Sequence, residues 1–227
     1  MKHIKHIFFD LDHTLWDFET NSNKTFAYIF QKNNMDVNFN DFNKAYEPIN
    51  TKYWKLFRED KISKADLRYF RLKETFDALN LDIEDKVIDV LSEDYITYLS
   101  KYNTLFDGAL ELLEYLQPKY AMHIITNGFE EVQFKKLENS KLAPFFDQII
   151  TSEKVGVKKP NPKIFKYALK KAKAQANESI MIGDNFEADI LGAKNMGMHT
   201  IFCKFTESIA TEEVITVSNL NQIKKYL

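Results

Sequence analysis

Apolar and polar residues alternate along this chain in two different patterns. Short, mostly apolar runs occur at residues 4–9, 121–125, 146–150, 179–183, 199–203 and 214–217. Runs of this length that end at polar residues are typical of strands buried on both faces of a parallel sheet. Helical spacing of apolar residues fills the stretches between most of the later runs, as at 110–116, 132–137 and 164–169. Strands that alternate with helices predict an α/β fold, a parallel sheet flanked by helices.

Residues 17–102 interrupt this alternation of strands and helices with a wholly helical pattern. Four stretches there carry apolar and aromatic residues at helical spacing: 26–30, 42–57, 67–76 and 87–99. Ser63 and Asp66 have the spacing of a capping box at the start of the third stretch. We expect an inserted all-helical cap domain, residues 17–102, and a catalytic core made of residues 1–16 and 103–227. The core of a helical bundle is the simplest explanation of the aromatic residues in this domain.

Composition narrows the range of partners. The chain has 227 residues, 44% of them hydrophobic, and a net charge of -2. It has no basic excess for a nucleic acid polymer or a membrane surface, and no apolar run of about 20 residues to span a bilayer. Cys203 is the only cysteine, and the N-terminus lacks the apolar centre of a signal peptide. We expect a cytoplasmic protein that is a monomer or a small homo-oligomer.

Two carboxylates, Asp10 and Asp12, directly follow the first apolar run. Ligands of open α/β sheets bind beyond the carboxyl ends of the strands, so these residues lie where chemistry is expected. An extended backbone would turn both side chains to the same side, where they repel each other unless a cation lies between them. A hard, oxygen-binding ion such as Mg²⁺ suits such a pair. Taken alone, the pair is equally consistent with a turn in which Asp12 caps the next segment.

Later strands of the predicted sheet also end at polar groups. Thr126 and Asn127 follow the second run, Lys159 lies in the loop after the third, and Asp184 and Asp189 follow the fourth. Each residue has an ordinary explanation as a helix cap, a solvated lysine or a surface charge. Their joint occurrence at strand ends, which meet on one side of a parallel sheet, indicates a single site.

This set of groups suits the hydrolysis of a phosphate ester. Asp10 could attack the phosphorus while Mg²⁺ lies between Asp10 and Asp184. Asp12 could protonate the leaving oxygen and later activate water. Hydrolysis would then run in two steps through an aspartyl phosphate on Asp10.

The phosphate itself would need hydrogen-bond donors and a fixed positive charge. The hydroxyl of Thr126 and the N–H of Asn127, at a predicted helix start, supply donors and the helix dipole. Lys159 supplies the charge and could keep Asp10 ionised.

Four motifs carry a family resemblance. Residues 10–14, 125–128, 157–160 and 183–189 read DLDHT, ITNG, VKKP and GDNFEAD. In this order they resemble the motifs of the haloacid dehalogenase-like hydrolases, and an insertion after the first motif resembles the helical-cap subclass of that family. The resemblance extends over the whole chain and implies a Rossmann-like core.

The resemblance implies a role for each motif residue. The nucleophile, the general acid/base and the two phosphate-binding residues would be Asp10, Asp12, Thr126 and Lys159. The groups implied for Mg²⁺ are Asp10, the backbone carbonyl of Asp12, Asp184 and, less directly, Asp189. Either Lys158 or Lys159 could bind the phosphate; we choose Lys159 because it precedes Pro160, as the family's lysine precedes its proline.

The resemblance also bears on the substrate. Dehalogenases lack an acid at the position of Asp12, so phosphate transfer is expected instead. The segments around Trp16, Phe18 and Phe129 are similar to the nucleoside 5′-monophosphate phosphatases of the family, which implies a nucleotide substrate whose base stacks on these rings. Packing at the hinge of the cap explains the three aromatic residues equally well.

Other functions stay open at this point. A sugar-phosphate phosphatase or a phosphomutase would use the same core residues. A non-enzymatic phospho-receiver module also combines paired carboxylates, a threonine, a lysine and Mg²⁺ beside a parallel sheet. Receivers are shorter, however, and carry no helical insertion of this size. The expected partner is a small phosphorylated metabolite, with a nucleotide as the first choice.

Overall fold

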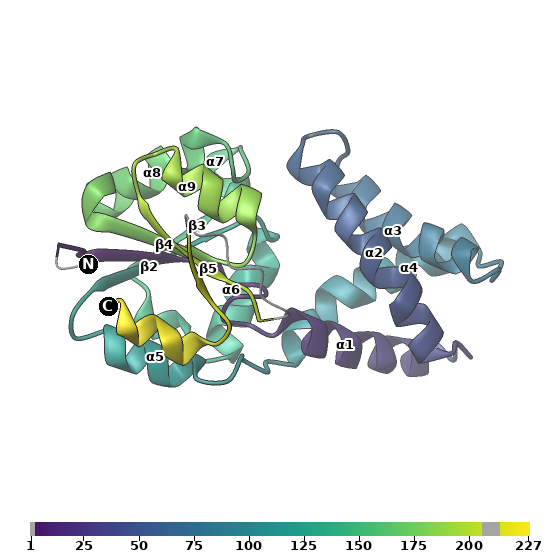
Figure 1. Cartoon of the computed structure of the whole chain (residues 1–227). Coiled ribbons are helices and arrows are strands. Elements are labelled where there is room, and N and C mark those ends of the chain that lie inside the picture. The colour runs from purple at the N-terminus through teal and green to yellow at the C-terminus, as the bar shows by residue number, and fades with distance from the viewer. Residues whose placement is uncertain (1–2, 206–213) are drawn as a thin grey trace. The chain divides into compact units, whose positions relative to one another are not determined.

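The structure is a computed structural model that describes residues 3–205 and 214–227. It divides into two compact units (Figure 1). The core unit consists of Met1–Phe18 and Asn103–Leu227, and the helical unit consists of Glu19–Tyr102. The boundaries predicted from the sequence lie after residues 16 and 102.

Six parallel strands form the sheet of the core unit: β1 (His6–Phe9), β2 (Ala121–Thr126), β3 (Gln148–Thr151), β4 (Ser179–Gly183), β5 (His199–Cys203) and β6 (Ile215–Val217). Their order across the sheet is β3-β2-β1-β4-β5-β6, so β1 lies between β2 and β4 (Figure 1). The predicted parallel sheet is confirmed. Each strand begins and ends within two residues of the apolar run that predicted it.

The apolar residues of β1 explain its central place. Ile7, Phe8 and Phe9 are fully buried, as expected of a strand covered on both faces. Phe9 is in register with Ile124 of β2 and with Ile182 of β4. The three strands therefore end almost side by side, and the residues that follow them are brought together.

Helices lie on both faces of the sheet (Figure 1): α5 (Ala109–Leu116), α6 (Glu130–Asn139), α7 (Ser152–Val155), α8 (Pro162–Ala172) and α9 (Gly192–Lys194). A π-helical segment, Phe186–Leu191, leads into α9. Pro162 lies in the first turn of α8, as predicted, and the side chain of Asn161 caps that helix. The sequence predicted only a loop after β3, but the Thr151 side chain caps the short helix α7 there.

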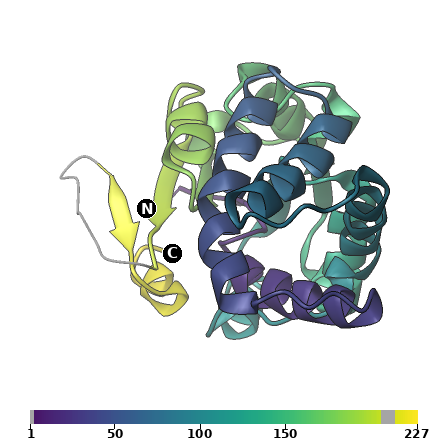
Figure 2. The same cartoon turned by 90° about the vertical axis from the view of Figure 1, so that its right-hand side faces the viewer.

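The helical unit contains α1 (Phe18–Lys32), α2 (Phe39–Arg58), α3 (Lys64–Ala78) and α4 (Asp85–Tyr98), with α1 beginning at the boundary residue (Figure 2). Residues 19–102 are all described and form no strand, as predicted. The capping box of Ser63 and Asp66 is present at the start of α3. Phe26 lies in the centre of the bundle, with its ring centroid 4.7 Å from that of Tyr46 and 4.5 Å from that of Tyr95. The aromatic residues of this unit therefore pack its core.

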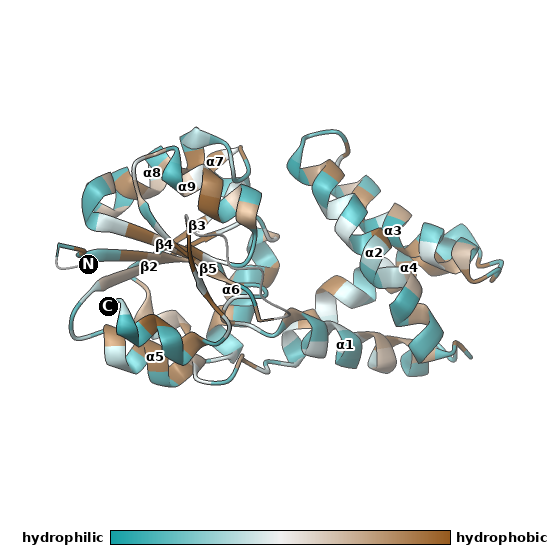
Figure 3. Cartoon of the chain, in the orientation of Figure 1, coloured by the Kyte–Doolittle hydropathy of each residue, from teal (hydrophilic) through white to brown (hydrophobic). Residues whose placement is uncertain are grey.

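The hydropathy of the residues follows this architecture (Figure 3). The strands of the sheet are mostly hydrophobic, whereas the helices combine hydrophobic and hydrophilic residues. Across the described parts of the chain, no helix is both long enough and apolar enough to cross a membrane.

Candidate active site

Several segments bring polar side chains to the carboxyl ends of the central strands. Asp10 follows β1, Thr126 ends β2 and Asp184 follows β4, and these three strands are neighbours in the sheet. Lys159 comes from the loop before α8, and Asp189 from the π-helical segment after β4. Residues far apart in the sequence thus reach one side of the sheet, as the strand-end pattern predicted.

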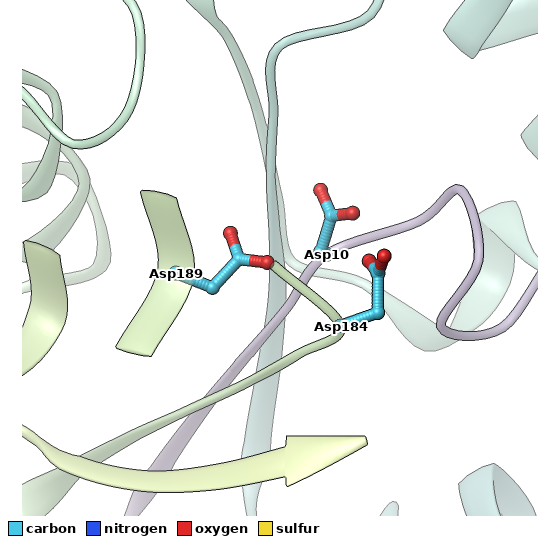
Figure 4. A group of neighbouring side chains, drawn as sticks. All are labelled: Asp10, Asp184 and Asp189. Atoms are coloured by element: carbon cyan, nitrogen blue, oxygen red, sulfur yellow. The ribbon is translucent and has the colours of Figure 1, made fainter. Parts of the chain in front are cut away.

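Three carboxylates and one ammonium form the centre of this site. Asp10, Asp184 and Asp189 each offer a carboxylate oxygen, and these oxygens all lie within 4.8 Å of one another (Figure 4). The Lys159 Nζ lies 2.6 Å from Oδ1 of Asp10 and 2.6 Å from Oδ1 of Asp189. It also donates a hydrogen bond to the backbone oxygen of Ile125, at 2.7 Å. Lys159, rather than Lys158, is therefore the lysine that reaches the carboxylates.

Burial and mutual repulsion make these carboxylates a fitting site for a cation. Burial raises the pKa of Asp10 well above its usual value, and Asp189 and Asp184 add to this while Lys159 opposes it. Burial and the charge of Asp189 raise the pKa of Asp184 to about 7. Burial lowers the pKa of Lys159, but Asp10 and Asp189 outweigh it and raise that pKa above its usual value. Oxygen ligands with an excess of negative charge suit a hard divalent ion such as Mg²⁺.

Asp189 reaches the cluster because Gly183 leaves room for it. A Cβ atom on Gly183 would lie 2.3 Å from Oδ2 of Asp189, closer than any side chain allows. The same oxygen accepts a hydrogen bond from the backbone N–H of Asn185, at 3.0 Å. Asp189 is fully buried, so its carboxylate is held rigidly. On the other side, the Thr14 hydroxyl donates to Oδ1 of Asp184 at 3.3 Å.

The Thr126 hydroxyl is arranged to donate a hydrogen bond. Its oxygen accepts hydrogen bonds from the N–H of Gly128 at 3.0 Å and from Nε2 of Gln133 at 2.6 Å. A hydroxyl has two acceptor lone pairs and one donor hydrogen. Because both lone pairs are used, the hydrogen is what Thr126 can offer to a bound oxyanion. This fits the predicted role of Thr126 in phosphate binding.

The side chain of Asn127 forms hydrogen bonds that were not predicted; the sequence predicted only that its backbone N–H would bind phosphate. Its side-chain Nδ2 donates to the backbone oxygen of Lys159 at 3.0 Å, and its Oδ1 accepts from the backbone N–H of Lys159 at 2.8 Å. These two hydrogen bonds join the end of β2 to the loop before α8. Asn127 therefore helps to place the lysine at the centre of the site.

Asp12 has partners different from those of Asp10. Strand β1 ends at Phe9, and the chain turns through His13, which has a φ of 60°. The expectation that both carboxylates point to one side stays a prediction. The Asp12 carboxylate accepts hydrogen bonds from Lys136 Nζ at 2.5 Å and from Gln133 Nε2 at 2.9 Å. Its side chain is absent from the group of three carboxylates that could hold a metal ion.

Gln133 and Lys136 were not predicted as site residues. The helix was predicted from apolar residues at 132–137, but Phe134 in that stretch is 37% exposed, whereas Gln133 and Lys136 are buried. The two buried residues are three positions apart and so share a helix face. Polar residues at such positions, just after a strand-end motif, were the signal that could have identified them.

The three aromatic residues considered for base stacking are all buried. Trp16 is 0% exposed, Phe18 7% and Phe129 4%. The Lys136 Nζ lies 4.0 Å from the centroid of the Trp16 ring, over its face. The Trp16 indole also donates to Oδ1 of Asn103, at 3.4 Å. These contacts favour packing for Trp16, and base binding by the three rings stays a prediction.

Comparison with known sequences places these features among hydrolases. A family model described as haloacid dehalogenase-like hydrolase matches residues 4–197. The pyrimidine 5′-nucleotidase YjjG of Escherichia coli is 32% identical over 225 residues, which cover 97% of this chain and 96% of that protein. A glyceraldehyde 3-phosphate phosphatase of Pyrococcus furiosus is 34% identical over 215 residues, or 90% of this chain and 82% of the relative.

A solved structure has the same fold over the full length. It is that of the HAD-hydrolase YfnB of Bacillus subtilis, described as bound to magnesium. The TM-score is 0.90 at 27% sequence identity, and the match covers 99% of this chain and 98% of that one.

Proposed function

This chain belongs to the haloacid dehalogenase-like hydrolases, and on that basis we propose that it is a Mg²⁺-dependent phosphatase of nucleoside 5′-monophosphates. Membership of a hydrolase family argues against the alternative of a phospho-receiver module. Relatives named as a 5′-nucleotidase and as a phosphatase support phosphate esters as the class of substrate.

The observation that carries the proposal is the separate placement of two carboxyl groups. Asp10 lies in the buried charged cluster with Lys159. Asp12 is held apart by two side chains of α6. The proposed reaction needs one carboxyl group to bond to phosphorus and a second to move a proton, and the separate partners of Asp10 and Asp12 suit this division of roles.

We infer a reaction in two steps. In the first, a carboxylate oxygen of Asp10 bonds to phosphorus, the ester P–O bond breaks, and the Asp12 carboxyl gives its proton to the leaving oxygen. In the second, a water oxygen bonds to phosphorus while the Asp12 carboxylate takes its proton. The bond between Asp10 and phosphorus then breaks and phosphate leaves. Both carboxyl groups thus return to their starting states.

Other core residues hold the phosphate during these steps. The Lys159 ammonium supplies a fixed positive charge, and its ion pairs with Asp10 and Asp189 keep it protonated. The Thr126 hydroxyl, with both lone pairs occupied, donates to a phosphate oxygen. Prearranged donors of this kind stabilise charge that develops in the transition state.

The residues present fit a bound Mg²⁺. Asp10, Asp184 and Asp189 offer closely spaced oxygens, and the family resemblance adds the backbone carbonyl of Asp12. When bound, the ion would neutralise these carboxylates and the phosphate. The magnesium described for YfnB supports this proposal.

The nucleotide substrate rests on the likeness to YjjG over nearly the whole chain. The likeness to the P. furiosus glyceraldehyde 3-phosphate phosphatase favours a second candidate, a small sugar phosphate. The catalytic residues touch only the phosphate in this mechanism, so they do not distinguish the two substrates.

A substrate panel tests the proposal. Phosphate release should be measured with Mg²⁺ from pyrimidine and purine nucleoside 5′-monophosphates, sugar phosphates and p-nitrophenyl phosphate. We expect pyrimidine nucleotides to have the highest kcat/KM; a higher value for glyceraldehyde 3-phosphate would select the second candidate. Asp10→Asn should lower kcat by several orders of magnitude, whereas Asp107→Asn, at an exposed position, should not. An Asp10→Asn enzyme with a tenth of the normal activity would contradict the aspartyl-phosphate mechanism.

A further inference from the structure

Two buried side chains of α6 hold the Asp12 carboxylate, one on each oxygen. Lys136 Nζ lies 2.5 Å from Oδ1, and Gln133 Nε2 lies 2.9 Å from Oδ2. We propose that Lys136 and Gln133 are positioning residues that orient the Asp12 carboxyl group for proton transfer to the leaving oxygen. This inference rests on the phosphatase function proposed above.

The two contacts restrict the rotation of the carboxyl group. A single donor would leave the group free to turn about its bond to Cβ, but donors on both oxygens define its plane. Lys136 and Gln133 are three residues apart on one helix, so they approach Asp12 as a rigid pair. Proton transfer needs a donor within hydrogen-bond reach of the leaving oxygen, so a defined orientation matters for the rate.

The burial of Lys136 is hard to explain by stability alone. Its side chain is 2% exposed, and burying an ammonium opposes folding unless strong partners offset the lost hydration. Here the partners are the Asp12 carboxylate and the faces of two aromatic rings. The Nζ atom lies 4.0 Å from the Trp16 centroid and 5.2 Å from the Phe18 centroid. A buried ion pair is seldom more stable than apolar residues of similar size, so a role in the reaction accounts for it better.

Gln133 also links the acid/base group to the phosphate-binding threonine. The same Nε2 atom donates to Oδ2 of Asp12 and to the Thr126 hydroxyl oxygen, at 2.9 and 2.6 Å. Its side chain passes over Gly128, where a Cβ atom would lie 2.5 Å from its amide carbon and nitrogen. One turn of α6 therefore sets the positions of the proton donor and the phosphate-binding hydroxyl together.

The leaving group of the substrate separates a positioning role from a merely structural one. An alkoxide from a nucleotide or glycerol phosphate needs a proton as it leaves, whereas nitrophenolate leaves readily without one. Misorientation of Asp12 should therefore slow the first step for alkyl esters far more than for p-nitrophenyl phosphate. General damage to the site would slow both esters by the same factor.

The test is a single-turnover measurement of alcohol or phenol release from both esters. Lys136→Met removes the donor and keeps much of the volume, and Lys135→Met is the matched control at an exposed position of the same helix. General acid catalysis contributes about 10²–10⁴-fold. We expect Lys136→Met to slow the alkyl ester at least about tenfold more than the nitrophenyl ester. Lys136→Arg should regain part of that loss, and Lys135→Met should match the wild type.

Each outcome bears on the proposal in a defined way. Equal losses on the two esters would overturn it and leave Lys136 as a packing residue, while the phosphatase function would stand. If the wild type hydrolysed neither ester, the phosphatase function would fail first and this inference with it. If Lys136→Met did not fold, Gln133→Leu would serve, since it removes the donor to the other oxygen. It should slow both esters through Thr126, with a larger loss for the alkyl ester, and an equal loss would again overturn the proposal.

Discussion

The side chain of Asn127 forms two hydrogen bonds with the backbone of Lys159, one to its carbonyl oxygen and one from its N–H. A residue at the end of β2 thereby holds a lysine that lies in a different loop. The backbone of Lys159 is held by these two hydrogen bonds, and its ammonium contacts Asp10 and Asp189. The position of the charged centre therefore depends on a neutral side chain.

Asn127→Ala should weaken catalysis without unfolding the protein. It leaves two backbone groups of Lys159 without their partners, which costs about 1–3 kcal/mol for a buried group, and it lets the lysine move. We expect kcat/KM for any phosphate ester to fall roughly tenfold to a hundredfold, because 1.4 kcal/mol corresponds to tenfold. Steady-state kinetics check this, with Asn195→Ala at an exposed position as the control. Unchanged kinetics would mean that Lys159 is held well enough by its ion pairs.

Mg²⁺ should stabilise the protein through its three clustered carboxylates. A ligand that binds only the folded state raises the melting temperature. Mg²⁺ would also relieve the repulsion between Asp184 and Asp189, which together with burial raises the pKa of Asp184 to about 7. Thermal unfolding with and without Mg²⁺ should show this rise, and EDTA should remove both the rise and the activity. Ca²⁺ should restore little activity, because its coordination is longer and looser.

Asp184→Asn provides the variant for the same measurement. It should abolish most of the rise in melting temperature with Mg²⁺, whereas Asp107→Asn, at an exposed position, should retain it. Full activity in EDTA, or an undiminished rise in Asp184→Asn, would contradict the metal assignment.

Gly128→Ala should act through Gln133. The added Cβ would lie 2.5 Å from the Gln133 amide, so that side chain must leave Thr126 and Asp12. We expect an activity loss of about the size seen on removing Gln133 itself. The decisive comparison is the double variant Gly128→Ala/Gln133→Ala, which should be no worse than Gln133→Ala alone, since neighbouring residues show non-additive effects. Additive losses would show that Gly128 serves another purpose.

Trp16 offers a test of base stacking. Its ring is fully buried and one face is covered by Lys136. Trp16→Leu should therefore lower kcat/KM for a nucleotide and for an alkyl phosphate without a base, such as glycerol phosphate, by similar factors, and should lower the melting temperature as a core substitution does. If the nucleotide alone were affected, by about tenfold or more as for a lost stacking contact, Trp16 would be a base-binding residue after all.

His123 should make the stability of the core unit depend on pH. Burial, together with nearby His6, lowers the pKa of His123 to about 4, against an ordinary value of 6.5. Its Nε2 lies 3.1 Å from Nδ1 of His6, and its ring centroid lies 4.7 Å from that of Phe8. Below pH 6.5 the unfolded chain binds a proton at His123 that the folded chain does not bind. The stabilisation of the folded state by neutral His123 is therefore fully present above pH 6.5 and is lost as the pH falls towards 4.

Urea unfolding at pH 7.5 and pH 5 checks the size of this effect. One pKa unit corresponds to about 1.4 kcal/mol, so the wild type should lose about 2 kcal/mol more than His123→Phe between these pH values. Parallel pH profiles of the two proteins would contradict the prediction.

The sequence was sufficient for the parts of the site that depend on strands. Buried parallel strands have continuous apolar runs, and the residues after such runs lie at the same edge of the sheet. Asp10, Thr126 and Asp184 could therefore be identified from the sequence alone. Asp12 was also identified, but its partners on α6 were not.

The partners of Asp12 could not be derived in the same way. Gln133 and Lys136 lie on a helix that was predicted from apolar residues alone, and the spacing of those residues says nothing about a buried glutamine or lysine. Solvated lysines and glutamines are common on helices, and only contact with a buried carboxylate distinguishes these two. Long-range pairing of this kind is not encoded in local spacing.

The central position of β1 also has a consequence for the order in which the protein is made. His6 pairs with Ala121 on one side and with Ser179 on the other, so β1, once synthesised, waits for partner strands that come much later in the sequence. Until they arrive, an apolar strand with free backbone groups is open to pairing with other chains. Asp10 and the residues around it therefore assemble only after β4 has been made, and a truncated chain that ends before β4 carries Asp10 but no finished site.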